Sequence, residues 1–302
     1  MRVLMLLSNT AGKGTYWRAV ELARPLARRG HTCTVLATSP RQRFRFEVRP
    51  DTCPRVTLVE APDMLWGPLR SGWDLWSVLA RIMWSRASKF DLVHAFESRP
   101  SVILPALYWQ RRRNARLVLD WCDWFGRGGS VEERPSALLR AALRPVETFF
   151  EERFRSHADG TTVINNLLRR KAIELGVKPD TILDLPNGCN VDGLRPVPQA
   201  AARSVLGWPD DVLVIGYIGA MFHRDALLMA QAFDRIQHAE PKARLLLAGY
   251  CNVAVEELVA APSGIWRTGR IRYHEIGRYL AACDVLWLPL RDSGANRGRY
   301  PL

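Results

Sequence analysis

The sequence predicts an α/β protein made of two doubly wound domains. Along its 302 residues, short apolar segments alternate with longer segments whose apolar residues recur at helical spacing. This alternation is typical of parallel sheets that are covered by helices on both faces. Two prolines lie close together in Leu194–Ala202, and a new strand–loop–helix unit begins on each side of them.

The predicted first domain spans residues 1–198. It begins with a strand at Val3–Leu7, followed by a glycine-bearing loop and a helix at Trp17–Arg29 that ends at Gly30. Further buried strands are expected at Thr32–Ala37, Val56–Glu60, Leu92–Ala95, Leu117–Asp120 and Gly160–Ile164.

The predicted second domain spans residues 199–302. Its strands are expected at Val212–Ile218, Arg244–Ala248, Ile265–Gly269 and Val285–Leu288. Ligands of doubly wound sheets bind beyond the carboxyl ends of the strands, so we expect the functional residues there, in a cleft between the domains.

The chain is strongly basic, with 43 Lys and Arg residues against 30 Asp and Glu residues and a net charge of +13. Nearly all of the surplus lies before residue 200. Such a surface suits phosphorylated ligands or an anionic membrane, and the alternative is a surface that is merely basic and solvated. No nucleic-acid partner is expected, because the basic residues form no tract and no zinc-finger or helix-turn-helix pattern occurs.

The cysteines and acidic residues predict neither a metal nor a cofactor. Six cysteines are scattered without a C-x-x-C pair, which favours a reducing cytoplasm over a disulfide framework. No D-x-D triplet and no H-E-x-x-H motif occur. No apolar run approaches the ~20 residues of a membrane span, and the apolar start of the chain is too short for a secretory signal.

Two loops are candidates for holding a phosphate. Gly12 and Gly14 follow the first strand, where the next helix offers unpaired N–H groups. Trp17 stands where a dinucleotide fingerprint needs a third glycine, so nicotinamide binding is disfavoured, and a tight turn without a ligand is the alternative. In the second domain Gly219 is followed by His223 and Arg224, and the alternative there is an exposed arginine in a loop.

The order of several short segments resembles a known family. The segments, in chain order, are the G-x-G loop, Glu21–His31, Asp91–His94, Leu185–Asp192, Gly216–Gly219, Leu246–Gly249 and Ala281–Pro289. Together they resemble the retaining glycosyltransferases of the GT-B fold, family 4 type, over nearly the whole chain. The resemblance implies two Rossmann-like doubly wound domains, a nucleotide-diphosphate sugar on the second, and an acceptor, either a glycan or a lipid-linked molecule, on the first. It also implies transfer with retention and without a metal.

The resemblance assigns candidate site residues. Those expected to bind the nucleotide sugar are Gly12, Gly14, Asn187, Gly219, His223, Arg224, Gly269, Arg270, Asp292 and Asn296. Where the family often carries a histidine near the reacting sugar, this chain reads Asp120–Trp124, so the catalytic candidates are Asp120, Asp123 and His94.

The family also carries two glutamates eight positions apart late in the second domain. Asp292 or Asn296 could replace the first, but the chain ends at Leu302 before the second. We therefore expect an incomplete second domain in a truncated chain. The alternatives are a GT-B sugar-nucleotide epimerase or phosphorylase-like enzyme, and an inactive membrane-associated binding protein.

Aromatic and basic residues gather in the stretch 61–90. Four tryptophans (Trp66, Trp73, Trp76 and Trp84) are interspersed there with Arg70, Arg81 and Arg86. Trp73, Trp76, Ala80, Met83 and Trp84 are expected to share one helical face. Such a face suits an anionic membrane surface and a peripheral position on its inner side, and the alternative is a face of the core. Trp121 and Trp124 are candidates to line an acceptor groove.

Overall fold

The computed structural model describes residues 1–191, 193–195, 197–221, 223–251 and 253–299. The chain divides into two compact units, one built from Met1–Gly188 with the residues that follow Asp292, and one from Cys189–Asp292. The second domain was predicted at 199–302, whereas the second unit begins at Cys189 and ends at Asp292. The segment that begins at Ser293 packs with the first unit, although we predicted it in the second.

The first unit contains an eight-stranded sheet. Its order is β3-β4-β2-β1-β5-β6-β7-β8, and all neighbours are parallel except β3, which runs antiparallel to β4. The strands are β1 (Arg2–Thr10), β2 (Thr32–Thr38), β3 (Glu47–Pro50), β4 (Val56–Ala61), β5 (Leu92–Phe96), β6 (Arg116–Trp121), β7 (Gly160–Val163) and β8 (Ile182–Asp184). The sequence did not predict β3 or β8, because β3 is exposed throughout and β8 buries only its first residue.

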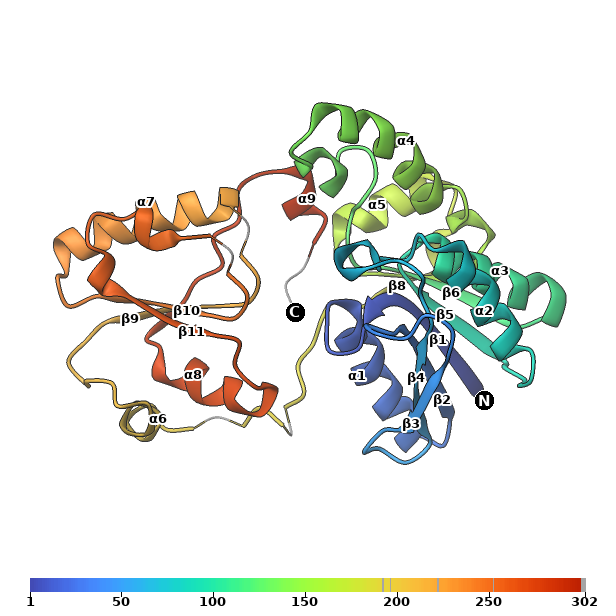
Figure 1. The fold of residues 1–302 in the computed structure, drawn as a ribbon, viewed down its shortest axis with the longest axis horizontal. Helices are drawn as coiled ribbons and strands as arrows, with labels where there is room; N and C mark the ends of the chain where they lie inside the picture. The colour runs from blue at the N-terminus through green and yellow to red at the C-terminus, as the bar shows by residue number, and fades with distance from the viewer. Residues whose placement is uncertain (192, 196, 222, 252, 300–302) are drawn as a thin grey trace. The chain divides into compact units, whose positions relative to one another are not determined.

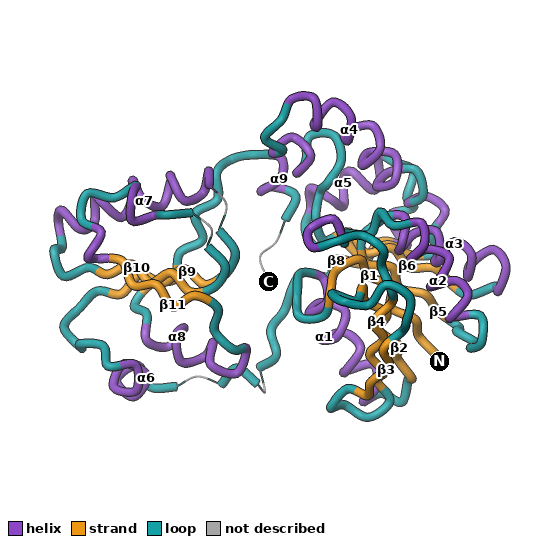
Figure 2. Tube along the Cα trace, viewed as in Figure 1, coloured by secondary structure: helices purple, strands orange, loops and turns teal. Residues whose placement is uncertain are grey.

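Helices cover both faces of this sheet (Figures 1 and 2). The helices of the first unit are α1 (Thr15–Arg28), α2 (Leu75–Ser85), α3 (Pro100–Arg113), α4 (Ala137–Glu152), α5 (Asn166–Glu174) and α9 (Gly294–Arg297). Short 3₁₀ helices are η1 (Gly67–Leu69), η2 (Ser130–Glu133), η3 (Arg155–His157) and η4 (Pro179–Thr181). Alternate residues of β1 enter two separate cores: Leu4 packs with the α3 side and Met5 with the α1 side. The predicted doubly wound α/β architecture is thus confirmed for this unit.

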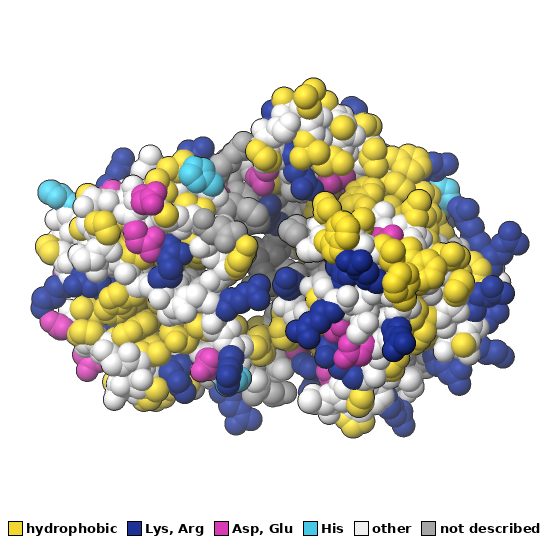
Figure 3. Space-filling view, in the orientation of Figure 1, with side chains coloured by type: hydrophobic (Ala, Val, Ile, Leu, Met, Phe, Trp, Pro, Cys, Tyr) yellow, Lys and Arg dark blue, Asp and Glu magenta, His cyan; other side chains and the backbone are white. Residues whose placement is uncertain are grey.

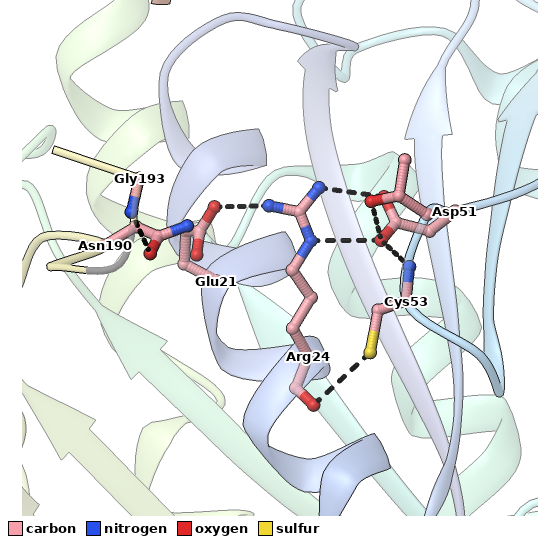
Figure 4. A network of polar contacts seen from close by, with 7 residues as sticks. Glu21, Arg24, Asp51, Cys53, Asn190 and Gly193 are labelled. Atoms are coloured by element: carbon pink, nitrogen blue, oxygen red, sulfur yellow. Dashed lines mark hydrogen bonds and ion pairs between the residues drawn. The ribbon is translucent and has the colours of Figure 1, made fainter. Parts of the chain in front are cut away.

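A polar network fixes α1 to the segment between β3 and β4 (Figure 4). The Arg24 guanidinium donates two hydrogen bonds of 3.0 Å to the Asp51 carboxylate and one of 2.6 Å to Glu21. The backbone N–H of Cys53 also donates to Asp51, at 2.9 Å. Burial by itself would raise the pKa of Asp51, but these hydrogen bonds outweigh it and lower the pKa.

The second unit contains a four-stranded parallel sheet of order β11-β10-β9-β12. Its strands are β9 (Val214–Ile218), β10 (Arg244–Ala248), β11 (Ile265–Gly269) and β12 (Val285–Leu286). Its helices are α6 (Gln199–Leu206), α7 (His223–Ala239) and α8 (Ile276–Ala282), with 3₁₀ helices η5 (Val255–Glu257), η6 (Pro262–Gly264) and η7 (Tyr273–Glu275). The edge strand β12 is two residues shorter than predicted, and both of its side chains are exposed.

The predicted tryptophan-bearing face of residues 61–90 is not one face. Trp73 precedes α2, Ala80 is buried and Met83 is exposed. Arg81 is fully buried and donates to the Leu7 carbonyl oxygen at 2.8 Å, and Arg70 donates to the Ser39 carbonyl oxygen at 2.8 Å. Arg81 therefore ties α2 to β1, and Arg70 ties its own segment to the residue after β2, because a buried guanidinium needs acceptors that the backbone supplies.

Among the described residues, no helix combines the length and the apolar character that crossing a bilayer would require.

Candidate active site

Polar side chains gather where β1, β5 and β6 end, at the carboxyl edge of the first sheet. This is the edge at which doubly wound sheets bind ligands. The three strands are neighbours in the sheet, with Leu6 of β1 paired to Ala95 of β5 and Phe96 of β5 paired to Asp120 of β6. The residues that follow these pairs therefore meet, although they are far apart in the sequence.

Arg18 and Asp120 form a buried ion pair at this edge. The Arg18 guanidinium donates to both carboxylate oxygens of Asp120, at 2.9 and 2.8 Å. The two side chains are 3% and 0% exposed. Arg18 also donates to the Asn187 side-chain oxygen at 2.8 Å and to the Leu185 carbonyl oxygen at 2.7 Å. Asp120 was predicted as a catalytic candidate and Asn187 as a donor ligand. In the structure, both accept hydrogen bonds from Arg18, which thereby joins α1 to β6 and to the segment after β8.

His94 lies beneath this pair and is neutral at physiological pH. Its Nε2 atom is 3.3 Å from the Thr162 hydroxyl oxygen, and that hydroxyl donates to Asp120. Burial lowers the pKa of His94 to about 4, despite the opposing charge of Asp120. The neutral imidazole is linked to Asp120 through the Thr162 hydroxyl, and its catalytic role stays a prediction.

Glu97 is a site residue that the sequence reading missed. It follows β5 directly, is 7% exposed, and has a backbone φ of +75°, a left-handed conformation that non-glycine residues rarely adopt. Its carboxylate accepts hydrogen bonds from the hydroxyls of Ser8 and Thr15, the latter at 3.1 Å. Burial raises its pKa. Strained and buried acidic residues of this kind concentrate at functional sites.

Asp123, the third catalytic candidate, lies two residues beyond β6 and is half-buried. Burial raises its pKa to about 7, and the negative charge of Glu97 adds to this shift. No hydrogen bond to its carboxylate occurs within the described residues. Of the three predicted catalytic residues, Asp123 alone combines partial exposure with a pKa suited to proton exchange near neutrality.

The raised pKa of Asp123 predicts a pH-dependent stability. The folded protein binds this proton up to about pH 7, whereas the unfolded chain releases it near the ordinary value of 3.8, so stability falls as pH rises through that window. Asp123→Asn should therefore be more stable than the wild type at pH 8, by about 1–3 kcal/mol, and equal to it below pH 4. Guanidinium chloride unfolding across this range measures the difference. A constant difference at every pH would contradict the assignment.

The first glycine loop has a local structural role. Gly14 has a φ of +51°, and a Cβ atom there would lie 2.8 Å from the Asn9 side-chain oxygen. Three backbone N–H groups at the start of α1, those of Thr15, Tyr16 and Trp17, already donate to Asn9, Lys13 and Gly14. The predicted phosphate contact at Gly12 and Gly14 therefore competes with internal acceptors, although Gly12 itself is exposed and has open space around its Cα atom.

In the second unit, three glycines meet at the carboxyl edge of the sheet. Gly219 follows β9, Gly249 follows β10 and Gly269 ends β11. The N–H of Gly219 donates to Ala248, and the N–H of Gly249 donates to Gly269 at 2.8 Å. A Cβ atom on Gly249 would lie 2.4 Å from the Gly219 carbonyl oxygen, so this close approach requires glycine. The edge therefore presents bare backbone beside the start of α7.

The other predicted donor residues surround this edge only in part. His223 and Arg270 are exposed, and the Arg270 guanidinium lies 5.7 Å from the centre of the Tyr250 ring. Arg224 lies in the first turn of α7, and its side chain is outside the described part of the structure. Asp292 is exposed at the end of the second unit, whereas Asn296 is buried in α9 and belongs to the first unit.

Asp225 was not predicted, yet it makes a buried contact at the start of α7. It lies in the first turn of α7, is 6% exposed, and accepts a hydrogen bond of 3.1 Å from the Arg291 backbone N–H. This contact ties the segment after β12 to α7. An acidic residue in the first turn of a helix is the sequence signal that could have identified it.

Of the two tryptophans predicted to line an acceptor groove, Trp121 is too buried to do so, and for Trp124 the call stays a prediction. Trp121 is 1% exposed and donates to Glu151 at 2.9 Å, while the Arg155 guanidinium lies 3.7 Å from the centre of its ring. Trp124 is partly buried against the same core as Trp121, and the Lys171 amine lies 4.3 Å from its ring. Both rings therefore serve packing.

Comparison with known proteins agrees with this arrangement. Residues 13–188 match the family described as glycosyl transferase 4-like domain. No curated protein matches the chain significantly. Among solved structures, sucrose-phosphate synthase from Thermosynechococcus elongatus is similar with a TM-score of 0.68 and 17% identity, over 97% of this chain and 77% of that one.

Two further solved structures share the fold. WaaG, a glycosyltransferase involved in lipopolysaccharide biosynthesis, has a TM-score of 0.67 and 16% identity, over 94% of this chain and 74% of that one. HepE from Anabaena, solved in complex with UDP-glucose, has a TM-score of 0.60 and 16% identity, over 95% and 73%. At these identities the likeness establishes the fold, and the family match extends over more than half of the chain. The protein belongs to the glycosyl transferase 4-like family and is a glycosyltransferase of the GT-B type.

Proposed function

We propose that the protein transfers a sugar from a nucleotide diphosphate to an acceptor hydroxyl, with retention of configuration and without a metal ion. The observation that carries the proposal is the glycine-lined edge of the second sheet, at Gly219, Gly249 and Gly269, beside the start of α7. Bare backbone and a helix N-terminus are the elements with which α/β proteins hold phosphate groups. The solved complex of HepE with UDP-glucose supports a donor of this class.

The leaving diphosphate would be stabilised by the protein itself. The amino-terminal end of α7 carries a partial positive charge, and Arg224 in its first turn supplies a cation. As the C1–oxygen bond to the diphosphate breaks, negative charge grows on the phosphate. These positive groups would stabilise that charge. The described residues contain no group of three His, Cys, Asp or Glu side chains arranged to hold a metal.

The acceptor would bind at the carboxyl edge of the first sheet. Neither Glu97 nor Asp123 forms an ion pair within the described residues, and burial, with the negative charge of Glu97 adding to it, raises the pKa of Asp123. We assign Asp123 the hydrogen bond from the attacking hydroxyl, because its partial exposure gives it access. The acceptor oxygen would then bond to C1 on the face that the diphosphate leaves, and the hydroxyl proton would pass to the Asp123 carboxylate. Candidate acceptors are a glycan and a lipid-linked molecule.

Calorimetric titration with uridine, guanosine and adenosine diphosphates and their sugar conjugates tests this proposal. We expect selective binding of one base, weakened about 10- to 100-fold in Arg224→Ala, because a charge-assisted contact to phosphate is lost. Arg235→Ala is the matched control, since Arg235 is exposed farther along α7, and its affinity should be unchanged. A folded chain that binds none of these nucleotides would contradict the donor assignment.

A separate outcome would redirect the proposal. If free nucleotide is released from the sugar conjugate without any acceptor, the chemistry is that of an epimerase or a hydrolase. The proposed role of Asp123 in binding the acceptor hydroxyl would then be wrong. Release that requires an added acceptor supports the transferase.

A further inference from the structure

A cavity lies at the amino edge of the first sheet, away from the candidate active site. Its volume is about 650 Å³, and it is lined by the residues before β5, the end of α3 and the start of β6. Lys89, Phe90 and Asp91 directly precede β5, whereas Glu97 directly follows it. The five residues of β5 separate the two sites by about 17 Å, at about 3.3 Å a residue. A ligand in this cavity is therefore neither the sugar donor nor the acceptor. We call it the amino-edge cavity.

The base of the amino-edge cavity is aromatic and fixed in place. The Phe90 and Trp109 side chains line it, and both are buried. Their rings meet edge to face, with 5.0 Å between the ring centres. The Trp109 Nε1–H donates to the Ser85 hydroxyl at 2.8 Å, which holds this ring. A concave site of this size, with an apolar base and a few polar groups, is the usual form of a small-molecule site.

The rim of the cavity is cationic. Four cations and one carboxylate line it, which gives a net charge of +3. The four cations, all exposed, are Lys89, Arg112, Arg113 and Arg116. The Asp91 carboxylate is already engaged, because it accepts a hydrogen bond of 2.6 Å from the Arg2 backbone N–H. Figure 3 shows Lys and Arg side chains gathered on this side of the first unit, around the end of α3. The charge therefore selects an anion.

The helix dipole accounts for only part of this charge. Arg112 and Arg113 lie in the last turn of α3, where cations offset the negative end of the helix. The Arg113 guanidinium also lies over the Trp109 ring, 5.3 Å from its centre. Lys89 and Arg116, however, belong to no helix. Within the described residues, the side chains of Lys89, Arg112 and Arg116 form no hydrogen bond or ion pair. Three uncompensated cations from different elements thus line one cavity, and their mutual repulsion is relieved when an anion binds.

From these observations we infer that the amino-edge cavity binds a soluble anion that carries two or more phosphate groups. A single phosphate group carries a charge of about −2 at neutral pH, which would leave part of the +3 uncompensated. Guanidinium groups match phosphate oxygens in geometry as well as in charge. Arg112 and Arg116 come from two different elements, so each contacts a separate phosphate. The inference adds a second binding site and does not rest on the proposed sugar transfer.

Calorimetric titration with inorganic tripolyphosphate, at about 0.15 M salt to screen long-range attraction, tests the inference. We expect saturable binding that the variant R112E/R116E weakens about 10-fold or more, because two charge-assisted contacts become repulsive. Both side chains are exposed, so this variant keeps the fold. The matched control is R28E/R29E, which makes the same charge change at two exposed arginines where α1 ends. Its affinity should stay within about 2-fold of the wild type.

The proposed donor site also attracts phosphate, so a third variant separates the two sites. Arg224→Ala should keep the tripolyphosphate binding that depends on Arg112 and Arg116. Conversely, R112E/R116E should bind nucleotide sugars as the wild type does, since its substitutions lie in the other unit. Failure at the amino-edge cavity therefore leaves the proposed donor site untouched.

Three results would overturn the inference. The wild type could show no saturable binding of tripolyphosphate at millimolar concentration. R112E/R116E and R28E/R29E could weaken the binding equally, which would make the effect one of overall charge. A duplex oligonucleotide could also bind through Arg112 and Arg116 while tripolyphosphate does not, which would make this side of the unit a nucleic-acid surface.

Discussion

Replacing Arg18 by methionine should lower the free energy of unfolding of the first unit by about 3–5 kcal/mol. The substitution leaves the Asp120 carboxylate buried without its counter-charge, although the Thr162 hydroxyl still donates to it. It also removes the hydrogen bonds from Arg18 to Asn187 and Leu185. Guanidinium chloride unfolding, followed by tryptophan fluorescence, measures the loss.

The matched control is an ion pair of similar length in a different environment. Lys242 and Asp211 lie 2.5 Å apart but are 62% and 67% exposed. Lys242→Met should cost far less than Arg18→Met, because water already solvates both charges. The double variant R18M/D120L should recover much of the stability that R18M loses, since it removes the stranded charge. If R18M and K242M lower the free energy of unfolding equally, burial does not make the Arg18–Asp120 pair more important for stability than an exposed pair.

The repeated strand and helix pattern made the fold predictable. Buried parallel strands such as β1 and β10 are continuous apolar runs, which the sequence displays directly. The missed strands have the opposite character. β3 has the sequence EVRP. Its pairing with β4 depends on tertiary contacts that cannot be predicted from these four residues. Strand propensity therefore located the centre of each sheet better than its edges.

The candidate site was less predictable because burial decides what an acidic residue can do. Asp120 and Asp123 look equivalent in the sequence, but Arg18, 102 residues away, neutralises only Asp120. Glu97 was missed because its backbone strain and its contacts with Ser8 and Thr15 arise only when β1 and β5 pair. Conversely, Gly219 follows one predicted strand in the structure and Gly269 is the last residue of another, so their position at the carboxyl edge was predictable from the sequence pattern.

The orientation of an amphipathic helix was equally hidden. The apolar spacing of α4 predicts a helix but not which side is buried, because the buried partners of Glu151 come from β6 and the loop after it. In the stretch 61–90 we predicted a membrane-facing side from the aromatic residues. The exposed stripe on α2 consists instead of Leu75, Leu79 and Met83, and Arg70 and Arg81 turned out to be internal.

Gly249→Ala should remove nucleotide binding and destabilise the second unit by about 3 kcal/mol or more. Gly249 has a φ of +118°, and the added Cβ atom would lie 2.4 Å from the Gly219 carbonyl oxygen, which is backbone and cannot turn aside. Relief requires the ends of β9 and β10 to separate, and that moves the edge at which the donor phosphate is proposed to bind. Calorimetric titration with the preferred nucleotide and chemical denaturation measure the two effects.

Gly207→Ala separates this contact from simple backbone strain. Gly207 ends α6 in the same unit with a φ of +68°, but a Cβ atom there has no neighbour within 4 Å. Its substitution should cost only the left-handed penalty, about 1–2 kcal/mol, and leave the affinity for nucleotide unchanged. Equal effects of the two substitutions on stability, together with wild-type affinity in Gly249→Ala, would show that the approach of Gly249 to Gly219 does not shape the donor site. A selective loss in Gly249→Ala would tie nucleotide binding to the glycine edge of the second sheet, because both positions have a positive φ but only Gly249 makes the close contact.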